Sequence, residues 1–217
     1  MEIQIIDKTD STMQLIIRGV DTSYVNALRR TMLSEVPTMA IEDVVIIENS
    51  SILHDEILAH RLGFVPLKTD LDSYNLPEEC PCKSEFGCNL CRVALTLEAE
   101  ATDEITAVYS KGLQSENPNV APVSGKILIA ELAPGQKIKL EAYARLGKGK
   151  IHAKWQPVST CSYDSEPQTE TGNNSHDTYV LSIESTGALP VERIVLEATQ
   201  ILDKRFQDFS KALRRMR

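Results

Sequence analysis

The sequence has 217 residues, 42% of them hydrophobic and 25% charged, which is an ordinary composition for a soluble globular chain. Its net charge of −8 disfavours strong DNA binding by this chain alone, because proteins that grip a phosphate backbone carry a basic face. No run of about 18 apolar residues and no signal-peptide pattern is present, so we expect a cytoplasmic protein without a membrane span.

The first part of the chain predicts a β-hairpin, a helix and a strand. The hairpin alternates apolar and polar residues around a polar turn, and the later strand is rich in β-branched residues. Asp21 or Thr22 can cap the start of the helix, and Pro37 ends it, because residues before a proline leave the α region. The three elements are expected over 3–17, 22–36 and 39–47.

The helix over 22–36 carries an apolar stripe and two adjacent arginines. Val25, Leu28 and Met32 recur at helical spacing and predict a buried face. Arg29 and Arg30 can form a solvated surface or anchor a partner, and this stretch alone favours the solvated interpretation, since most exposed helical charges only decorate a surface.

The middle of the chain predicts one short helix followed by mostly β structure. The helix, over 52–67, contains His54 and His60, whose six-residue separation puts them on different helix faces and favours packed or solvated side chains over metal ligands. A polar, cysteine-bearing loop is expected at 68–92, and the polar stretch 159–177 predicts a mobile loop. Extended segments are expected over 93–99, 105–109, 126–132, 137–142, 151–158 and 179–183.

A long C-terminal helix is expected over 191–216. At 1.5 Å per residue it would extend for about 39 Å, longer than a small sheet could cover. The surplus favours an intermolecular contact, although the helix could also lie along its own core with a frayed end. Its apolar residues recur every three or four positions: Val191, Ile194, Val195, Ala198, Ile201, Leu202, Phe206, Phe209 and Leu213.

Four cysteines lie within twelve residues: Cys80, Cys82, Cys88 and Cys91. Thiolates suit Zn²⁺, and a closed set of four would make a structural site with no position for a catalytic water. Disulfides are disfavoured in a chain without a signal sequence, and unligated thiols remain an alternative. The spacing does not match the usual iron–sulfur patterns. Cys161 lies seventy residues after this group, so we expect it to be an ordinary buried or loop cysteine and not a metal ligand.

No catalytic constellation is recognisable in the sequence. It has no phosphate-binding glycine loop, no GxSxG and no HExxH, and the segment 147–150 (GKGK) lacks the spacing of a P-loop. A non-enzymatic protein is favoured, and two alternatives remain: a free-standing, zinc-stabilised regulator that binds nucleic acid, and an enzyme of unknown class.

Three ordered blocks of sequence resemble one family. VNALRRTMLSEVPTMAI (25–41) resembles the helix shared by the amino-terminal domain of the bacterial RNA polymerase alpha subunit and its archaeal and eukaryotic counterparts. ILHDEILAHRLGFVPL (52–67) and GKGKIHAKWQPVS (147–159) resemble further blocks of the archaeal and eukaryotic branch. The chain is identified as a member of this family, and its ending soon after the last helix favours the archaeal D-type subunits.

The resemblance implies an α+β fold with a discontinuous dimerisation domain over 1–46 and 177–217. This domain consists of a small antiparallel sheet and two main helices, and a mostly β domain over 47–176 carries the cysteine loop 80–91. It implies a four-helix core shared with a small subunit L. The matching surfaces are the apolar stripes of the two helices, namely Val25, Leu28 and Met32 with Ile194, Ala198, Ile201, Leu202, Phe206 and Phe209.

The resemblance also implies a place in a larger enzyme. It places Arg29 and Arg30 near the large catalytic subunits, with Arg30 reaching the second-largest, and makes subunits N and P neighbours. The role would be assembly of DNA-directed RNA polymerase, a nucleotidyltransferase complex whose chemistry the large subunits perform. Two departures stand out: five residues separate the cysteine pairs, and residues 162–176 are too few for the iron–sulfur domain of some relatives, so we expect no such cluster.

Overall fold

The computed structural model describes residues 1–165 and 178–215, which belong to two compact units. Both chain ends contribute to unit 1, Met1–Val36 with Lys148–Arg217, and unit 2 is Pro37–Gly147. The domain boundaries expected from the sequence, after residues 46 and 176, differ from these unit boundaries, which follow Val36 and Gly147.

The sequence predicted a mobile loop at 159–177. This prediction is wrong for its first residues, because strand β9 (Val158–Ser165) pairs with β10 (Thr178–Ser185). Its remaining residues, 166–177, lie outside the described part.

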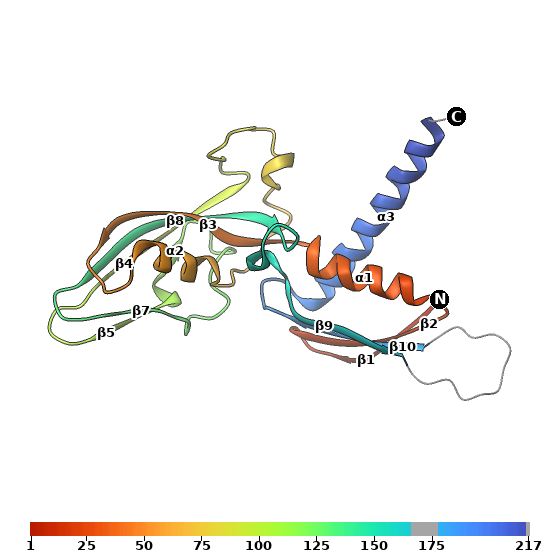
Figure 1. Ribbon diagram of the computed structural model, residues 1–217, viewed down its shortest axis with the longest axis horizontal. Helices are drawn as coiled ribbons and strands as arrows, with labels where there is room; N and C mark the ends of the chain where they lie inside the picture. The colour runs from red at the N-terminus through yellow and green to blue at the C-terminus, as the bar shows by residue number, and fades with distance from the viewer. Residues whose placement is uncertain (166–177, 216–217) are drawn as a thin grey trace. The chain divides into compact units, whose positions relative to one another are not determined.

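Unit 1 is a four-stranded antiparallel sheet with helices on one face (Figure 1). The strand order is β1-β2-β10-β9, so two strands from the start of the chain lie beside two strands from its later part. Inward side chains of β2 and β10 are buried, among them Leu15, Ile17 and Tyr179, as the alternating pattern requires. The further elements are β1 (Glu2–Lys8), β2 (Thr12–Arg18), α1 (Thr22–Ser34) and α3 (Val191–Arg215).

Helix α1 begins and ends much as its sequence predicts. Asp21 is the N-cap residue, but its side chain makes no capping hydrogen bond, so the predicted side-chain cap is wrong for Asp21. The Thr22 hydroxyl instead bonds the Tyr179 hydroxyl at 2.6 Å, which ties the helix start to β10. The helix ends at Ser34, three residues before Pro37.

Unit 2 is mostly β, as expected. One antiparallel sheet has the order β3-β8-β4-β6, and β5 pairs separately with β7. Residues 151–158, which belong to unit 1, were expected to be extended; that prediction is wrong for 151–157, which form turns and the short 3₁₀ helix Ala153–Trp155, and only Val158 is extended, as the first residue of β9. The elements of unit 2 are β3 (Pro37–Asn49), α2 (Asp55–Gly63), β4 (Arg92–Glu100), β5 (Thr106–Tyr109), β6 (Gln114–Ser115), β7 (Leu128–Leu132) and β8 (Lys137–Lys148).

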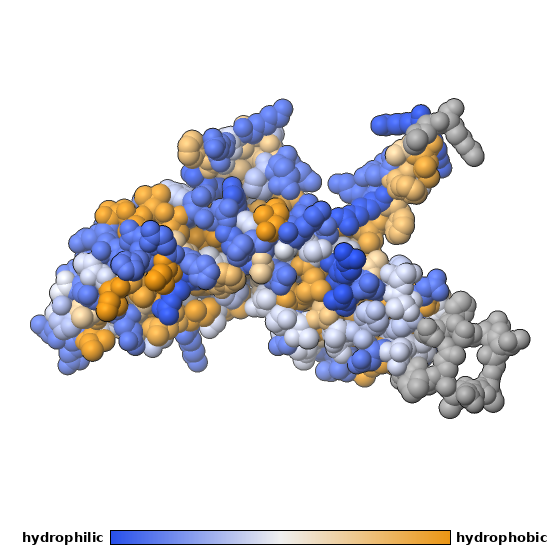
Figure 2. Space-filling view, in the orientation of Figure 1, coloured by the Kyte–Doolittle hydropathy of each residue, from blue (hydrophilic) through white to orange (hydrophobic). Residues whose placement is uncertain are grey.

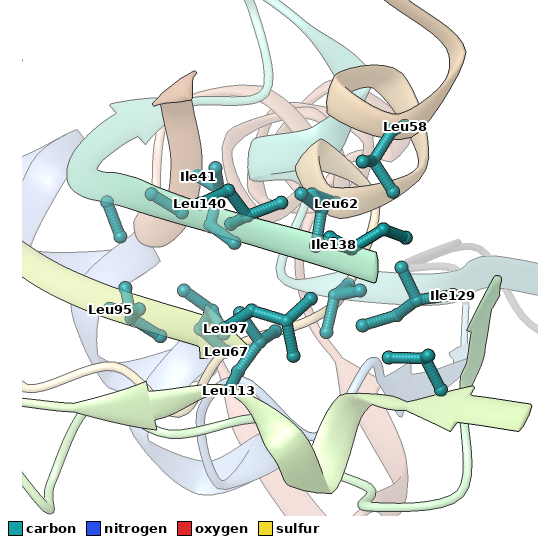
Figure 3. Close-up of a cluster of buried hydrophobic side chains, with 14 of the residues drawn as sticks. Ile41, Leu58, Leu62, Leu67, Leu95, Leu97, Leu113, Ile129, Ile138 and Leu140 are labelled. Atoms are coloured by element: carbon teal, nitrogen blue, oxygen red, sulfur yellow. The ribbon is translucent and has the colours of Figure 1, made fainter. Parts of the chain in front are cut away.

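A single hydrophobic cluster fills unit 2 (Figure 3). Leu58 and Leu62 of α2 point into it together with inward side chains of β4, β7 and β8, such as Leu95, Ile129 and Leu140. Each of these five side chains is at most 1% exposed. The unit therefore has a core of its own. With helices and antiparallel sheets in both units, the predicted α+β class is confirmed.

Candidate partner-binding surface and metal centre

The apolar stripe of α1 is used inside unit 1. Val25, Leu28 and Met32 are 0%, 4% and 0% exposed, and α1 packs against α3 and β9. On α3, Ile194 and Ala198 are buried in the same way. Five of the predicted partner-binding residues therefore belong to the core of this chain, where they position the two helices.

The second half of α3 leaves its apolar stripe open. Ile201 and Leu202 are partly buried, whereas Phe206 and Phe209 are 65% and 62% exposed, and every residue from 203 to 215 is exposed. Figure 2 shows this half of the helix as hydrophilic on one side and hydrophobic on the other. At 1.5 Å per residue, 25 residues span about 37 Å, so the surplus length predicted from the sequence is present as bare apolar surface.

The two arginines of α1 differ in their surroundings. Arg29 is partly buried, and its guanidinium donates to the Asn26 side-chain oxygen at 3.0 and 3.3 Å. Arg30 is exposed, and its guanidinium forms no ion pair or hydrogen bond with another described residue. Arg30 is thus the arginine of this pair that is available to an external carboxylate.

Two contacts fix the far end of α1, and sequence reasoning assigned neither. The backbone N–H of Lys150 donates to the Ser34 carbonyl at 2.9 Å, which satisfies one of the carbonyls that a helix end leaves unpaired. Gly149 passes so close that a Cβ there would lie 2.2 Å from the Leu33 carbonyl oxygen. The only sequence signal was the short, glycine-rich segment 147–150, of which the sequence showed only that it lacks the spacing of a P-loop.

An ion pair joins the end of α1 to the middle of α3. The Arg205 guanidinium lies 2.7 Å from the Glu35 carboxylate, whose side chain is 12% exposed. Glu35 is the C-cap residue of α1, and Arg205 lies where the stripe of α3 becomes exposed. The pair thus links the end of α1 to the part of α3 where the apolar stripe becomes exposed.

The four clustered cysteines of unit 2 converge. Their sulfur atoms all lie within 4.8 Å of one another. The Sγ–Sγ distances are 3.7 Å for Cys80–Cys88 and 3.9 Å for both Cys82–Cys91 and Cys88–Cys91. Gly87, at φ 76°, makes the turn before the second pair, and a Cβ there would lie 3.2 Å from the Cys91 sulfur.

This donor set fits a tetrahedral metal ion. Four sulfurs at a zinc–sulfur distance of about 2.3 Å are separated from one another by about 3.8 Å, which is close to the three Sγ–Sγ distances of 3.7, 3.9 and 3.9 Å. Among the described residues, this is the only group of three or more potential ligands close enough to hold an ion. Cys161 is not part of it and lies in β9, where burial raises the pKa of its thiol to about 11.

The thiols of the cluster differ in acidity. The backbone N–H of Ser84 and the Cys80 thiol lower the pKa of Cys82 to about 7. The backbone N–H of Cys82 favours the thiolate of Cys80, but burial and the other thiols raise the pKa of Cys80 to about 12. Cys82 is therefore the easier of these two to deprotonate, and a bound cation would hold the others as thiolates.

The histidines of α2 take no part in this site. His60 is exposed and packs against the Phe64 ring, with centroids 5.0 Å apart, while His54 is the N-cap residue of the helix.

No helix among the described residues is long and apolar enough to cross a membrane.

Comparison with known proteins gives one consistent result. Residues 14–206 match the model of the RNA polymerase Rpb3/Rpb11 dimerisation domain. DNA-directed RNA polymerase subunit Rpo3 of Methanosphaera stadtmanae is 46% identical over 172 residues, which cover 78% of this chain and 63% of that protein. Rpo3 of Pyrococcus horikoshii is 35% identical over 266 aligned positions, covering 100% of this chain and 99% of the relative. Rpo3 of Archaeoglobus fulgidus is 31% identical and is covered to 97%.

Proposed function

Since this chain belongs to the Rpb3/Rpb11 family of DNA-directed RNA polymerase subunits, we propose that it is the archaeal D-type subunit and acts as an assembly platform. The observation that carries this proposal is the bare apolar half of α3. Phe206 and Phe209 expose most of their surface in the isolated chain, and large aromatic side chains of this kind are typical anchors of protein interfaces.

The partner proposed for this surface is the small subunit L, an Rpb11-type chain. A partner that brings its own apolar helix would bury Ile201, Leu202, Phe206 and Phe209 of α3 along one seam. The buried residues Val25, Leu28, Met32, Ile194 and Ala198 would then act indirectly, because they hold α1 and α3 in the arrangement that the partner meets.

The platform would dock the two large catalytic subunits, with subunits N and P as neighbours. Arg30 is the proposed contact to the second-largest subunit, since its exposed guanidinium is available for a bidentate bond to a carboxylate. Arg29, already bonded to Asn26, would support the helix surface at that contact. In this proposal the chain has no active site, and the nucleotidyl transfer occurs in the cytoplasm on the large subunits.

For the cysteine cluster we propose one structural zinc ion. Cys80, Cys82, Cys88 and Cys91 would hold it and leave no coordination position open, so its contribution is to order the loop between the short helix at 77–79 and β4. The second candidate, a free-standing regulator that binds nucleic acid, is disfavoured because the net charge is −8 and only Lys83 and Arg92 are basic near the cluster in the sequence.

Coexpression tests the assembly role. The chain is produced with and without the small subunit of the same organism, and mass is measured by light scattering after gel filtration. We expect a one-to-one heterodimer and poor recovery of the chain alone. A monodisperse monomer that does not bind the small subunit, and that binds DNA with an affinity that falls steeply as salt rises, would favour the nucleic-acid-binding regulator instead.

Docking of the large subunits is tested separately with Arg30→Glu. We expect this variant to pair with the small subunit normally but to recover at least tenfold less of the large subunits when tagged protein is isolated from cells. Arg214→Glu, a charge reversal near the end of α3, is the matched control. Equal recovery of the large subunits with Arg30→Glu and wild type would show that Arg30 is not the docking contact.

A further inference from the structure

Each of the four sulfurs in the cysteine cluster accepts one backbone N–H. Such donors stabilise a thiolate relative to a thiol, so the loop favours the charged form that binds a metal ion. Hydrogen bonds to metal-bound atoms also fix the orientation of the ligands. The donors are the N–H groups of Cys82 to Cys80, of Ser84 to Cys82, of Leu90 to Cys88 at 3.4 Å and of Cys88 to Cys91 at 3.2 Å.

Three of these bonds join an N–H to the sulfur two residues earlier, so the backbone of the residue in between orients the donor. That residue is Pro81 in the first bond, Lys83 in the second and Asn89 in the third. Neither Pro81 nor Asn89 has a positive φ, whereas Lys83 has a φ of 48°. Among the described residues, Lys83 is the only one other than glycine with a positive φ. This left-handed conformation is unfavourable for a residue with a Cβ, so the loop has to stabilise it at Lys83.

Lys83 and Gly87 are the first and last residues of the spacer between the two cysteine pairs, and both are left-handed. The Lys83 N–H donates to the Cys80 carbonyl at 3.4 Å, and the Gly87 N–H donates to the Ser84 carbonyl at 3.1 Å. A tight turn therefore lies at each end of the spacer, and the four sulfurs still converge across its five residues. Glycine meets the conformational requirement at one end, but a residue with a long side chain meets it at the other.

The Lys83 side chain does not account for this conformation. It is exposed, and its ammonium forms no ion pair or hydrogen bond with another described residue. The backbone around Lys83 is what the loop uses, because the residue lies between the Cys82 sulfur and the Ser84 N–H that bonds it.

We propose that Lys83 is a positioning residue of the metal centre, because its left-handed backbone directs the Ser84 N–H to the Cys82 sulfur and closes the first cysteine pair on the ion. This inference rests on the proposed zinc ion and deepens it, since it names a residue outside the four ligands that sets the affinity for the metal. Side chains that tolerate the left-handed region should preserve metal binding at this position, and β-branched side chains should weaken it.

The test is metal binding by the full-length chain, coproduced with the small subunit and stripped of metal with a chelator. Co²⁺ is titrated first, because its visible absorption reports tetrahedral geometry and the number of bound thiolates, and Zn²⁺ then competes for the site. Lys83→Val should bind Zn²⁺ about tenfold more weakly or worse, because a β-branched residue is strained in the left-handed region. At saturation its cobalt complex should also show weaker thiolate-to-cobalt absorption, because the first pair closes incompletely.

Three variants separate the backbone of Lys83 from its charge. Lys83→Gly and Lys83→Asn also lack the ammonium but tolerate a positive φ, so they should bind Zn²⁺ within about threefold of wild type and restore the cobalt spectrum. Lys83→Gln removes the charge alone and should bind within about twofold of wild type. Glu85→Val is the matched control, because it places the same side chain in the spacer at a residue without a positive φ. It should bind like wild type.

The outcomes distinguish the positioning role from the zinc site itself. If wild type takes up neither Co²⁺ nor Zn²⁺, both proposals fail. If wild type binds and Lys83→Val matches its affinity and cobalt spectrum, the zinc site stands and Lys83 is not a positioning residue. If the glycine, glutamine and valine variants all weaken binding equally, the ammonium is responsible and the backbone role is overturned. The metal-free variants should melt like wild type, because no residue from 80 to 91 belongs to the core cluster of unit 2.

Discussion

Helices α2 and α3 each carry an apolar stripe, but they differ in what covers it. Leu58 and Leu62 of α2 are fully buried in the core of unit 2, whereas Phe206 and Phe209 of α3 are about two-thirds exposed in unit 1. Unit 2 thus has a complete core and one cysteine loop that a metal ion would order. Unit 1 has a small core and an apolar surface that a partner would complete. We therefore expect unit 1 to depend on a second chain, and the loop of unit 2 to depend on an ion.

The largest effect on partner binding is expected from changes in the exposed apolar half of α3. The double variant Phe206→Asp/Phe209→Asp should weaken binding of the small subunit by about 1,000-fold or more, because interface anchors each contribute on the order of 2 kcal/mol and charges now occupy their place. Calorimetry measures the loss. Lys204→Asp, on the opposite side of the helix, is the matched control and should bind normally. If the control and the double variant bind alike, α3 does not form the interface.

The cysteine loop should respond to a different change. Cys88→Ser removes one of the four thiolates, so we expect zinc to fall from about one per chain to near zero by elemental analysis. Limited proteolysis should then cut within 77–92, while the core of unit 2 stays folded, since none of the four cysteines belongs to that cluster.

The same variant sharpens the comparison between the units. Binding of the small subunit by Cys88→Ser should remain within about twofold of wild type, because α3 belongs to the other unit. Cys161→Ser, the matched control, should keep its zinc. Iron in place of zinc, or unchanged metal content after Cys88→Ser, would contradict the proposed site.

A smaller, local effect is expected at the end of α1. Gly149→Ala forces a Cβ to within 2.2 Å of the Leu33 carbonyl oxygen, so the loop or the helix end must shift. Such overpacking should cost about 2 kcal/mol of unfolding free energy, measured by urea denaturation. Lys150→Ala keeps its backbone N–H and so should be neutral. Equal stability of all three proteins would mean that this close approach is not maintained in solution.

The sequence predicted the parts of this molecule that depend on local patterns. The periodicity of α1 and α3, the alternation in β4 and the spacing of the four cysteines each report on residues close together in the chain. The surplus length of α3 was also evident, because helix length follows from residue count.

Other features depend on which distant segments meet. The sequence of strand β9 is mostly polar, because an edge strand with few buried side chains needs few apolar residues. Only its pairing with β10 identifies it as a strand. The roles of Gly149 and of the Glu35–Arg205 pair depend on the packing of segments more than a hundred residues apart. The periodicity of α1 likewise cannot tell whether Val25 and Met32 meet this chain or a partner, and the structure buries them in this chain.

The smallest effect is expected from the ion pair between α1 and α3. Arg205 is 53% exposed, so solvent screens the pair, and its contribution to stability should be about 0.5 kcal/mol. A double-mutant cycle with Glu35→Gln and Arg205→Gln measures the coupling directly and removes effects of each side chain on other neighbours. The coupling energy should decrease as the salt concentration rises from 0.1 to 1 M, because the Debye screening length falls from about 10 Å to about 3 Å.

The cycle becomes more informative when it is measured on partner binding as well. If the pair only stabilises unit 1, the two single variants should bind the small subunit like wild type. If it also sets the direction of the open half of α3, as its position at the end of the buried part suggests, both singles should weaken binding two- to threefold and the double variant no further. Additive losses would instead mean that Arg205 contacts the partner itself.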